Sequence, residues 1–325
     1  MYCFIALFLF IVNITAQTSG KCGDQCTWTY SETTLKLTGI GKGEMQKIYA
    51  DNLVPWKHLK DSITKITLSG IKIISQKSFQ NMPQLKIIEF GEVTEIGQGA
   101  FYNTGIESVT ITEHIQKINK NAFEQCEKLK TVEFSTNSQL ETIEERVFSN
   151  CVSLKSIILP ESLVRIEKKV FEGCSNLSMI QIGNKVEKIG DHLFVKCFSL
   201  TSITIGLNNQ KYSAINNVIF TKDQKTLIYY PIGLPSKEYT VPTGTMVIRK
   251  EAFTESELER VYFPFDLVTI EESAFYGNRF LKQLTFPHYL QSIGETAFAG
   301  CRSLENITIT SEVTIGNQAF IGCRK

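Results

Sequence analysis

The sequence is poor in the residue patterns from which active sites are built. Only four histidines occur among 325 residues, and none lies in a His-Glu-x-x-His arrangement. A nucleophile elbow, a calcium loop and a paired Cys-x-x-Cys motif are missing too. The glycine-rich stretch at residues 39–43 opens no helix with the spacing of a phosphate or dinucleotide loop. These absences predict a protein that is not an enzyme and has no catalytic, cofactor-binding or metal-binding residues.

An excess of charge of one sign is also missing. The chain has 34 basic and 33 acidic residues, which gives a formal net charge of +1. A protein that binds nucleic acid needs a basic stripe to neutralise phosphates. The charge balance therefore predicts that nucleic acid is not a partner.

Long hydrophobic runs are absent as well. Residues 4–12 form an uninterrupted apolar run, but it is too short to span a membrane as a helix. No later stretch approaches 18 apolar residues, so we expect no membrane span in this chain. The early run followed by Asn-Ile-Thr-Ala predicts a signal peptide over residues 1–16, cut near Ala16. A secreted or extracellular cell-surface location follows from that prediction.

Phenylalanine, by contrast, is abundant and recurs at regular intervals. Successive members of the series lie 22 to 25 residues apart, except for one step of 59 residues. The series is Phe79, Phe101, Phe123, Phe148, Phe171, Phe194, Phe253, Phe275, Phe298 and Phe320. A period near 23 indicates a solenoid, because a unit of that size cannot bury its own apolar face and must stack on its neighbours.

One repeat shows how a unit is expected to fold. Residues 163–185, LVRIEKKVFEGCSNLSMIQIGNK, share with the other units the pattern L/V-x-x-I-x-x-x-A/V-F-x-x-C-x-x-L-x-x-I-x-I. The tail of the pattern alternates with period two and predicts a short strand with one buried face. The A/V-F-x-x-C-x-x-L part predicts a helical or 3₁₀ turn. Stacked units therefore form a β-rich right-handed superhelix with a parallel sheet and an interior ladder of Phe rings.

These motifs resemble the BspA-like leucine-rich repeat family of bacterial and protist surface antigens. The resemblance rests on segments such as IEKKVFEGCSNLSMIQI from Ile166 and IGETAFAGCRSLENITI from Ile293. It also rests on the head segment CGDQCTWTYSETTLKLTGIGKGEM from Cys22, and it extends to Lys325. The resemblance implies a leucine-rich repeat solenoid, a secreted or cell-surface setting, adhesion or contact with host proteins, and no catalysis.

The chain divides into three parts on this basis. Residues 1–16 form the predicted signal peptide, and residues 17–70 form an N-terminal β cap that shields the first turn. Residues 71–325 form about ten leucine-rich repeats. The step of 59 residues falls within them and predicts a long unit with a β-hairpin at about residues 206–245.

The cysteines fall into two groups. Cys22 and Cys26 lie four residues apart in the cap, and a local disulfide is favoured because no second pair of zinc ligands lies nearby. The other group follows the recurring Phe by three residues and should form a buried column: Cys126, Cys151, Cys174, Cys197, Cys301 and Cys323. Small buried hydrophobes and bridges between turns both remain possible for this column.

The outward face of the predicted strands is the candidate binding surface. In each I-x-I segment the middle residue points away from the core, as does the residue two positions earlier. The candidate residues on this face and in the nearby hairpin are Ile158, Met179, Gln181, Thr204, Tyr229, Tyr230, Arg260 and Tyr262. The tyrosines and Arg260 are residue types that act as interface anchors. The plainer alternative is that Thr and Ser on this face simply suit exposed strand positions.

Two sequons predict N-glycosylation at Asn176 and Asn306. A glycan on Asn306 would cover one end of the sheet and shift binding toward the N-terminal turns. The leading functional hypothesis is a glycoprotein that binds a protein or glycan of a host cell or of the extracellular matrix. The alternative is a structural or receptor-like ectodomain that recognises the organism's own surface molecules. The sequence leaves the ligand, the oligomeric state and a further C-terminal anchor open.

Overall fold

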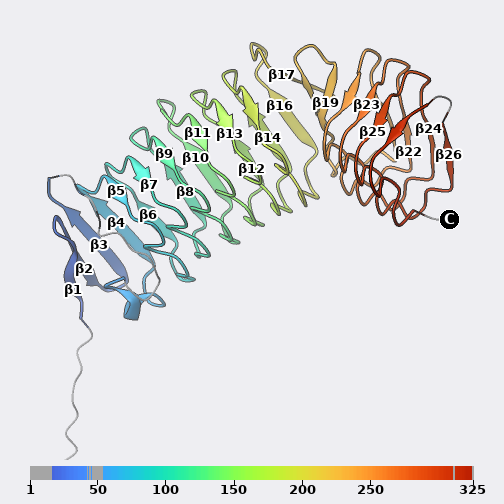
Figure 1. Cartoon of the computed structure of the whole chain (residues 1–325). Coiled ribbons are helices and arrows are strands. Elements are labelled where there is room, and N and C mark those ends of the chain that lie inside the picture. The colour runs from blue at the N-terminus through green and yellow to red at the C-terminus, as the bar shows by residue number, and fades with distance from the viewer. Residues whose placement is uncertain (1–16, 42, 44, 46–53, 310–311, 324–325) are drawn as a thin grey trace, which may run out of the picture.

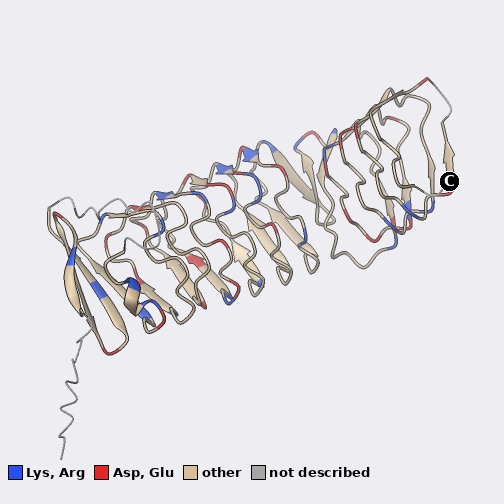
Figure 2. Ribbon diagram, turned by 60° about the horizontal axis from the view of Figure 1, so that its bottom comes forward, with Lys and Arg blue, Asp and Glu red and all other residues tan. Residues whose placement is uncertain are grey.

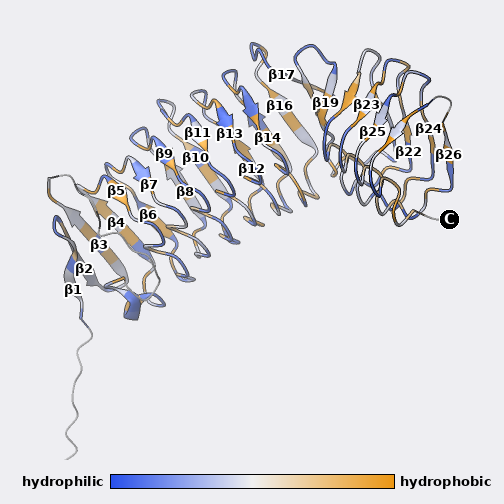
Figure 3. Cartoon of the chain, in the orientation of Figure 1, coloured by the Kyte–Doolittle hydropathy of each residue, from blue (hydrophilic) through white to orange (hydrophobic). Residues whose placement is uncertain are grey.

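The computed structural model shows a curved stack of about 11 turns preceded by a small antiparallel cap (Figure 1). It describes residues 17–41, 43, 45, 54–309 and 312–323. The predicted signal peptide at residues 1–16 lies outside the described residues. Figure 3 shows apolar residues concentrated along the strands and hydrophilic residues in the turns, the arrangement expected when stacking buries one face of every unit.

The cap is built from three antiparallel strands that join the first turns of the stack. They are β1 (Ser19–Gly23), β2 (Cys26–Ser31) and β3 (Thr34–Gly39). The last of them pairs in parallel with β4 (Lys65–Ser69), so the cap continues directly into the parallel sheet. Trp28 and Trp56 are buried beneath it with ring centroids 6.1 Å apart, and the short 3₁₀ helix η2 (Lys57–Leu59) follows Trp56. Aromatic side chains thus close the N-terminal end of the core.

Each later turn contributes two strands to two parallel arrays. The longer strands carry the I-x-I segments that the sequence predicts. They are β6 (Ile87–Glu89), β8 (Ser108–Ile111), β10 (Thr131–Phe134), β12 (Ser156–Ile158), β14 (Met179–Ile182), β16 (Ser202–Ile205), β20 (Glu238–Thr240), β22 (Arg260–Tyr262), β24 (Gln283–Thr285) and β26 (Asn306–Thr308). Buried and exposed residues alternate in most of them, as in β8, whereas β26 is exposed throughout.

The second array consists of two-residue strands, which were not predicted from the sequence because most of them carry a single apolar residue. They are β5 (Ile73–Ile74), β7 (Glu95–Ile96), β9 (Lys117–Ile118), β11 (Thr142–Ile143), β13 (Arg165–Ile166), β15 (Lys188–Ile189), β21 (Val247–Ile248), β23 (Thr269–Ile270), β25 (Ser292–Ile293) and β27 (Thr314–Ile315). Between the arrays the chain forms tight turns closed by bonds such as Cys126 N–H to Phe123 O, 3.3 Å.

The predicted Phe ladder is confirmed. Successive rings stack along the interior, with centroid separations from 4.6 Å for Phe253–Phe275 to 6.0 Å for Phe148–Phe171. Trp56 extends the ladder at its N-terminal end, 5.4 Å from Phe79. Burial of these rings is a main source of stability, since aromatic side chains remove large apolar areas from water.

The cysteine column lies beside the ladder, and its thiols are free. Each thiol donates to the carbonyl oxygen of the Phe in the preceding turn, as Cys174 Sγ does to Phe148 O at 3.1 Å. In one of the turns without cysteine, Asn278 Nδ2 makes the equivalent bond to Phe253 O at 2.8 Å. The thiols therefore give most of these buried carbonyl groups a second hydrogen bond, beside the backbone N–H that closes the turn, as Cys151 N–H does at Phe148 O.

The long unit contains an antiparallel hairpin that divides the core in two. Its strands are β17 (Tyr212–Ile215), β18 (Val218–Thr221) and β19 (Thr226–Tyr229). Both faces of β18 are buried: Ile219 packs into the N-terminal core, while Val218 and Phe220 pack into the C-terminal core. The strand β19 then pairs in parallel with β21 and restarts the stack.

Candidate functional site

Four of the predicted surface residues come together on three neighbouring strands. Ile158 on β12 lies beside Gln181 on β14, which lies beside Thr204 on β16. Met179 is two residues before Gln181 on the same strand face and is half-buried. Ile158 is 57% exposed. We call Ile158, Met179, Gln181 and Thr204 the N-terminal patch.

Two further predicted residues lie on β22 in the second half of the stack. The Arg260 Nη1 lies 2.5 Å from Glu238 Oε1 on the neighbouring strand β20, and the Tyr262 hydroxyl donates to Glu238 Oε2 at 3.2 Å. The hydrogen bond that Arg260 donates to Glu238 raises the pKa of the exposed Arg260. One carboxylate thus fixes both side chains, and we call Arg260 and Tyr262 the C-terminal patch.

The two hairpin tyrosines do not belong to this face. Tyr230 is only 2% exposed and stacks on Phe253 with centroids 5.0 Å apart, so the expectation that it is a surface anchor is wrong. Tyr229 is half-buried and packs 5.0 Å from Phe194. Burial raises the pKa of both hydroxyls, that of Tyr230 to about 12. Tyr229 thus continues the aromatic ladder of the N-terminal half, and the adjacent Tyr230 begins that of the C-terminal half.

The predicted modification sites are both accessible. Asn176 is exposed in the turn before β14, and Asn306 is exposed on β26. Asn306 on β26 lies beside Gln283 on β24. The strand β24 thus separates Asn306 from β22, which carries the C-terminal patch. Cys22 and Cys26 form a disulfide, with Cα atoms 4.9 Å apart. Glycosylation at the two asparagines stays a prediction.

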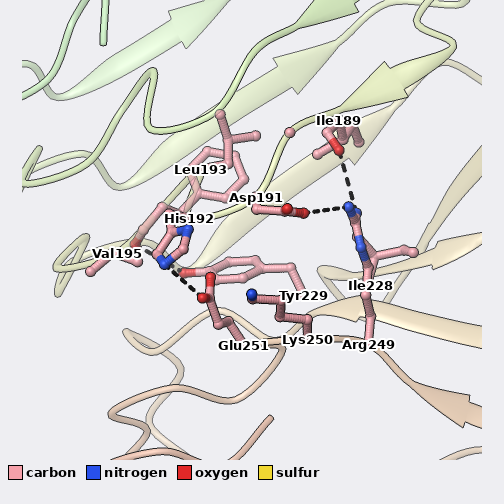
Figure 4. Close-up of a pocket in the computed structure, with 12 residues that line it drawn as sticks. Ile189, Asp191, His192, Leu193, Val195, Ile228, Tyr229, Arg249, Lys250 and Glu251 are labelled. Atoms are coloured by element: carbon pink, nitrogen blue, oxygen red, sulfur yellow. Dashed lines mark hydrogen bonds and ion pairs between the residues drawn. The ribbon is translucent and has the colours of Figure 1, made fainter. Parts of the chain in front are cut away.

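A small pocket of about 40 Å³ opens where the hairpin interrupts the second array of strands (Figure 4). Arg249 crosses it and donates to Ile189 O at 3.3 Å and to Asp191 Oδ1 at 2.6 Å. His192 Nε2 lies 2.6 Å from Glu251 Oε1. Charged side chains from turns nearly 60 residues apart in sequence thus hold the two halves of the stack together.

Burial dominates the electrostatics of this pocket. It raises the pKa of Glu251 to about 7, an effect that Lys250 partly offsets and Asp191 reinforces. The Glu251 Oε2 atom is buried without a hydrogen-bond partner. Burial, followed by the charges of Lys169 and Lys250, lowers the pKa of His192. A wider hollow of about 570 Å³ adjoins this pocket and shares Asp191 and Arg249 in its lining.

The residues of this pocket were not predicted from the sequence. They come from turns, and no motif links Asp191 and His192 to Arg249 and Glu251. Within the described part of the chain, no group of three or more His, Cys, Asp or Glu residues could hold a metal ion. Basic and acidic residues alternate along the whole stack (Figure 2). Pairs that link successive turns, such as Lys130–Glu107 at 2.8 Å, make much of this pattern.

These features define a leucine-rich repeat solenoid whose accessible surface is a set of side chains in register on parallel strands. The family model described as the BspA type leucine-rich repeat region matches six copies, over residues 58–151, 94–227 and 234–325. The chain belongs to this family. The family resemblance inferred from the sequence is therefore confirmed.

Solved structures show the same fold. A leucine-rich repeat protein from Eubacterium ventriosum is 20% identical, with a TM-score of 0.68, over 91% of this chain and 73% of that one. The pneumococcal vaccine antigen PcpA is 20% identical, with a TM-score of 0.58, over 93% and 87%. A leucine-rich cell surface protein from Faecalibacterium prausnitzii is 22% identical, with a TM-score of 0.58, over 89% and 94%.

Two other comparisons complete the description. No curated protein matches this chain. A search of the residues that the structure describes finds no helix with the length and apolar character needed to cross a membrane.

Proposed function

We propose that this protein is a non-enzymatic, secreted or cell-surface protein that binds a protein or glycan of host cells or of the extracellular matrix. The observation that carries the proposal is the register of the N-terminal patch, in which three paired strands present Ile158, Gln181 and Thr204 side by side. Exposed apolar residues that are surrounded by neutral polar ones mark interaction sites.

The comparisons support the proposed secreted or cell-surface location. The family consists of repeat proteins, and two of the similar structures are described as a vaccine antigen and as a cell surface protein. The fold carries its variable residues on a constant scaffold, which suits recognition of macromolecules.

Binding of the purified chain to epithelial cells and to immobilised matrix proteins tests the proposal. A variant with Ile158→Glu, Gln181→Glu and Thr204→Glu should lose at least tenfold in affinity, because it places three like charges side by side on the patch. The matched control carries Thr136→Glu, Asn137→Glu and Gln139→Glu in an exposed turn. Equal binding by the two variants and the wild type would assign recognition to another surface. Absence of wild-type binding to any host or matrix sample would refute the proposal.

A further inference from the structure

A second hollow, of about 360 Å³, lies beside the C-terminal patch. Its walls come from β22, β24 and the turns that follow these strands. Its lining includes Arg260, Tyr262, Phe265, Gln283, Thr285 and His288. This volume is at the lower end of the range of small-ligand sites and has room for about one or two sugar rings. We call it the aromatic hollow.

Exposed aromatic rings surround the hollow. Phe265 is 65% exposed and Tyr262 is 46% exposed, although aromatic residues elsewhere in the stack are mostly buried. Tyr289 packs edge-on against Phe265 with centroids 4.8 Å apart and so holds that ring in place. Phe263 and Phe286 stack 5.7 Å apart beneath the surface and support both turns. The rings are therefore preorganised and need little ordering when a ligand binds.

Polar side chains complete the lining. Gln283, Thr285 and His288 are exposed, and their side chains make no hydrogen bond with the part of the chain that the structure describes. Together they offer an amide, a hydroxyl and an imidazole, which can both donate and accept. Such groups next to aromatic rings match the hydroxyl groups and the apolar C–H faces of a sugar.

The strand pairing argues against an extended peptide as the ligand. Peptides that dock on sheets usually add a strand to a free edge, where unpaired backbone groups bind them. Here β22 and β24 each have a partner on both sides, in the order β20-β22-β24-β26. Recognition in the hollow therefore depends on side chains alone.

The charge of the hollow also limits which ligands can bind there. Its one cation, Arg260, is neutralised by the carboxylate of Glu238 at 2.5 Å. A strongly acidic ligand would have to compete with that carboxylate for the guanidinium. The surroundings of Tyr262 and Phe265 thus favour an uncharged ligand.

We propose that the aromatic hollow binds a neutral glycan, with a sugar ring against Phe265 and Tyr262 and its hydroxyl groups bonded to Gln283, Thr285 and His288. This inference rests on the proposed function and names the ligand class for the second of the two patches. The N-terminal patch plays no part in it.

Isothermal titration and saturation-transfer NMR with lactose, N-acetyllactosamine and chitobiose test the inference on unglycosylated protein. The wild type should bind at least one of these probes with a millimolar or lower Kd, and Phe265→Ala should weaken binding at least tenfold. Because Phe265 is largely exposed, its truncation should leave the fold intact, which circular dichroism checks. The matched control is Phe198→Ala, since Phe198 is 57% exposed but lies outside the hollow.

The outcomes separate this inference from the proposed function. No binding of the three probes by the wild type, or equal binding by Phe265→Ala, overturns the glycan inference. Host-cell binding that persists after enzymatic removal of cell-surface glycans, and in the Phe265→Ala variant, also overturns it but leaves the proposed function standing.

The sequon at Asn306 gives a second check. Asn306 lies directly beside Gln283, so a glycan attached there would stand at the rim of the hollow. Protein made in a glycosylating host should therefore bind the probes at least tenfold more weakly than its Asn306→Gln variant wherever mapping shows Asn306 modified. Equal binding by the two forms would contradict this placement of the ligand.

Discussion

Arg249 donates through its guanidinium to the backbone carbonyl of Ile189 at 3.3 Å. In regular turns the equivalent carbonyl accepts from a backbone N–H, as Ile166 O accepts from Gly190 N at 2.8 Å. The hairpin displaces the next strand from that position, since β15 ends the first array of short strands and β21 pairs with β19. The side chain of Arg249 thus replaces a missing backbone donor, and its second bond to Asp191 fixes its direction.

Removal of this guanidinium should therefore destabilise the protein. We expect Arg249→Met to lower the free energy of unfolding by about 1–3 kcal/mol, because it leaves the Ile189 carbonyl without its donor. Thermal unfolding followed by calorimetry measures the effect. Arg165→Met is the control, since Arg165 is 52% exposed and pairs only with the nearby Glu167. Equal effects of the two substitutions would show that Arg249 has no special role.

Glu251 should make stability depend on pH. Burial raises its pKa from 4.5 to about 7 in the folded protein, so the folded state binds a proton that the unfolded chain releases. The stability that the protein gains from protonation of Glu251 is complete below pH 4.5 and is lost as the pH rises through 7. The free energy of unfolding of Glu251→Gln, taken relative to that of the wild type, should therefore rise by about 1–3 kcal/mol from pH 5 to pH 8.

Melting temperatures of both proteins at pH 5 and pH 8 check this expectation. His192 acts in the opposite sense, because its lowered pKa removes stability as the pH falls below 6.5, but it is present in both proteins. Glu107→Gln is the control, since its exposed carboxylate has a pKa lowered by Lys130. A difference between Glu251→Gln and the wild type that is the same at both pH values would rule out a raised pKa for Glu251.

The Phe ladder should carry a large share of the stability. Phe171 is fully buried between Phe148 and Phe194, at 6.0 and 5.9 Å. Phe171→Ala should cost about 3–5 kcal/mol, the usual cost of a cavity of that size. Urea unfolding monitored by circular dichroism measures it, and the exposed Phe198→Ala should change stability by less than about 0.5 kcal/mol. Similar losses in both variants would contradict the ladder as a source of stability.

The buried members of the cysteine column should be chemically silent in the folded protein, whereas Cys323 is half-buried and its hydrogen bond with Cys301 lowers its pKa. Burial raises the pKa of Cys126 to about 11 and that of Cys174 to about 12, so the reactive thiolate is scarce at pH 8. Iodoacetamide should modify neither residue within hours in buffer but should modify both in urea. Mass spectrometry identifies the sites. Rapid modification of Cys174 in native protein would contradict its burial.

The sequence predicted the stack because identical local signals recur many times. Each Phe, such as Phe123, has the same position in its repeat and packs in the same way as its neighbours. The pattern of one repeat therefore predicts the structure of all the repeats. The two-residue strands could not be foreseen in the same way, because one buried residue such as Ile118 shows no period. Tyr230 was wrongly predicted to be exposed for a related reason. The local sequence of a hairpin does not show which of its aromatic side chains will be buried.

The surface was predictable only in part. Alternation along a strand fixed the outward direction of Ile158 and Gln181, and the common register of the repeats brought them together. The aromatic hollow was missed, although the repeated Phe-Pro pairs at 263–264 and 286–287 signal that two successive turns share a conformation. The contacts of Arg249 could not be predicted, since they bridge turns that only the hairpin brings near one another.

Because β18 seals an apolar interior on each of its sides, the halves of the molecule meet at the hairpin and at the contacts around Arg249. Gene duplication could lengthen one half by whole turns while the other kept its shape and its ligand. The length of the molecule and the chemistry of its contact surface can therefore change separately during evolution.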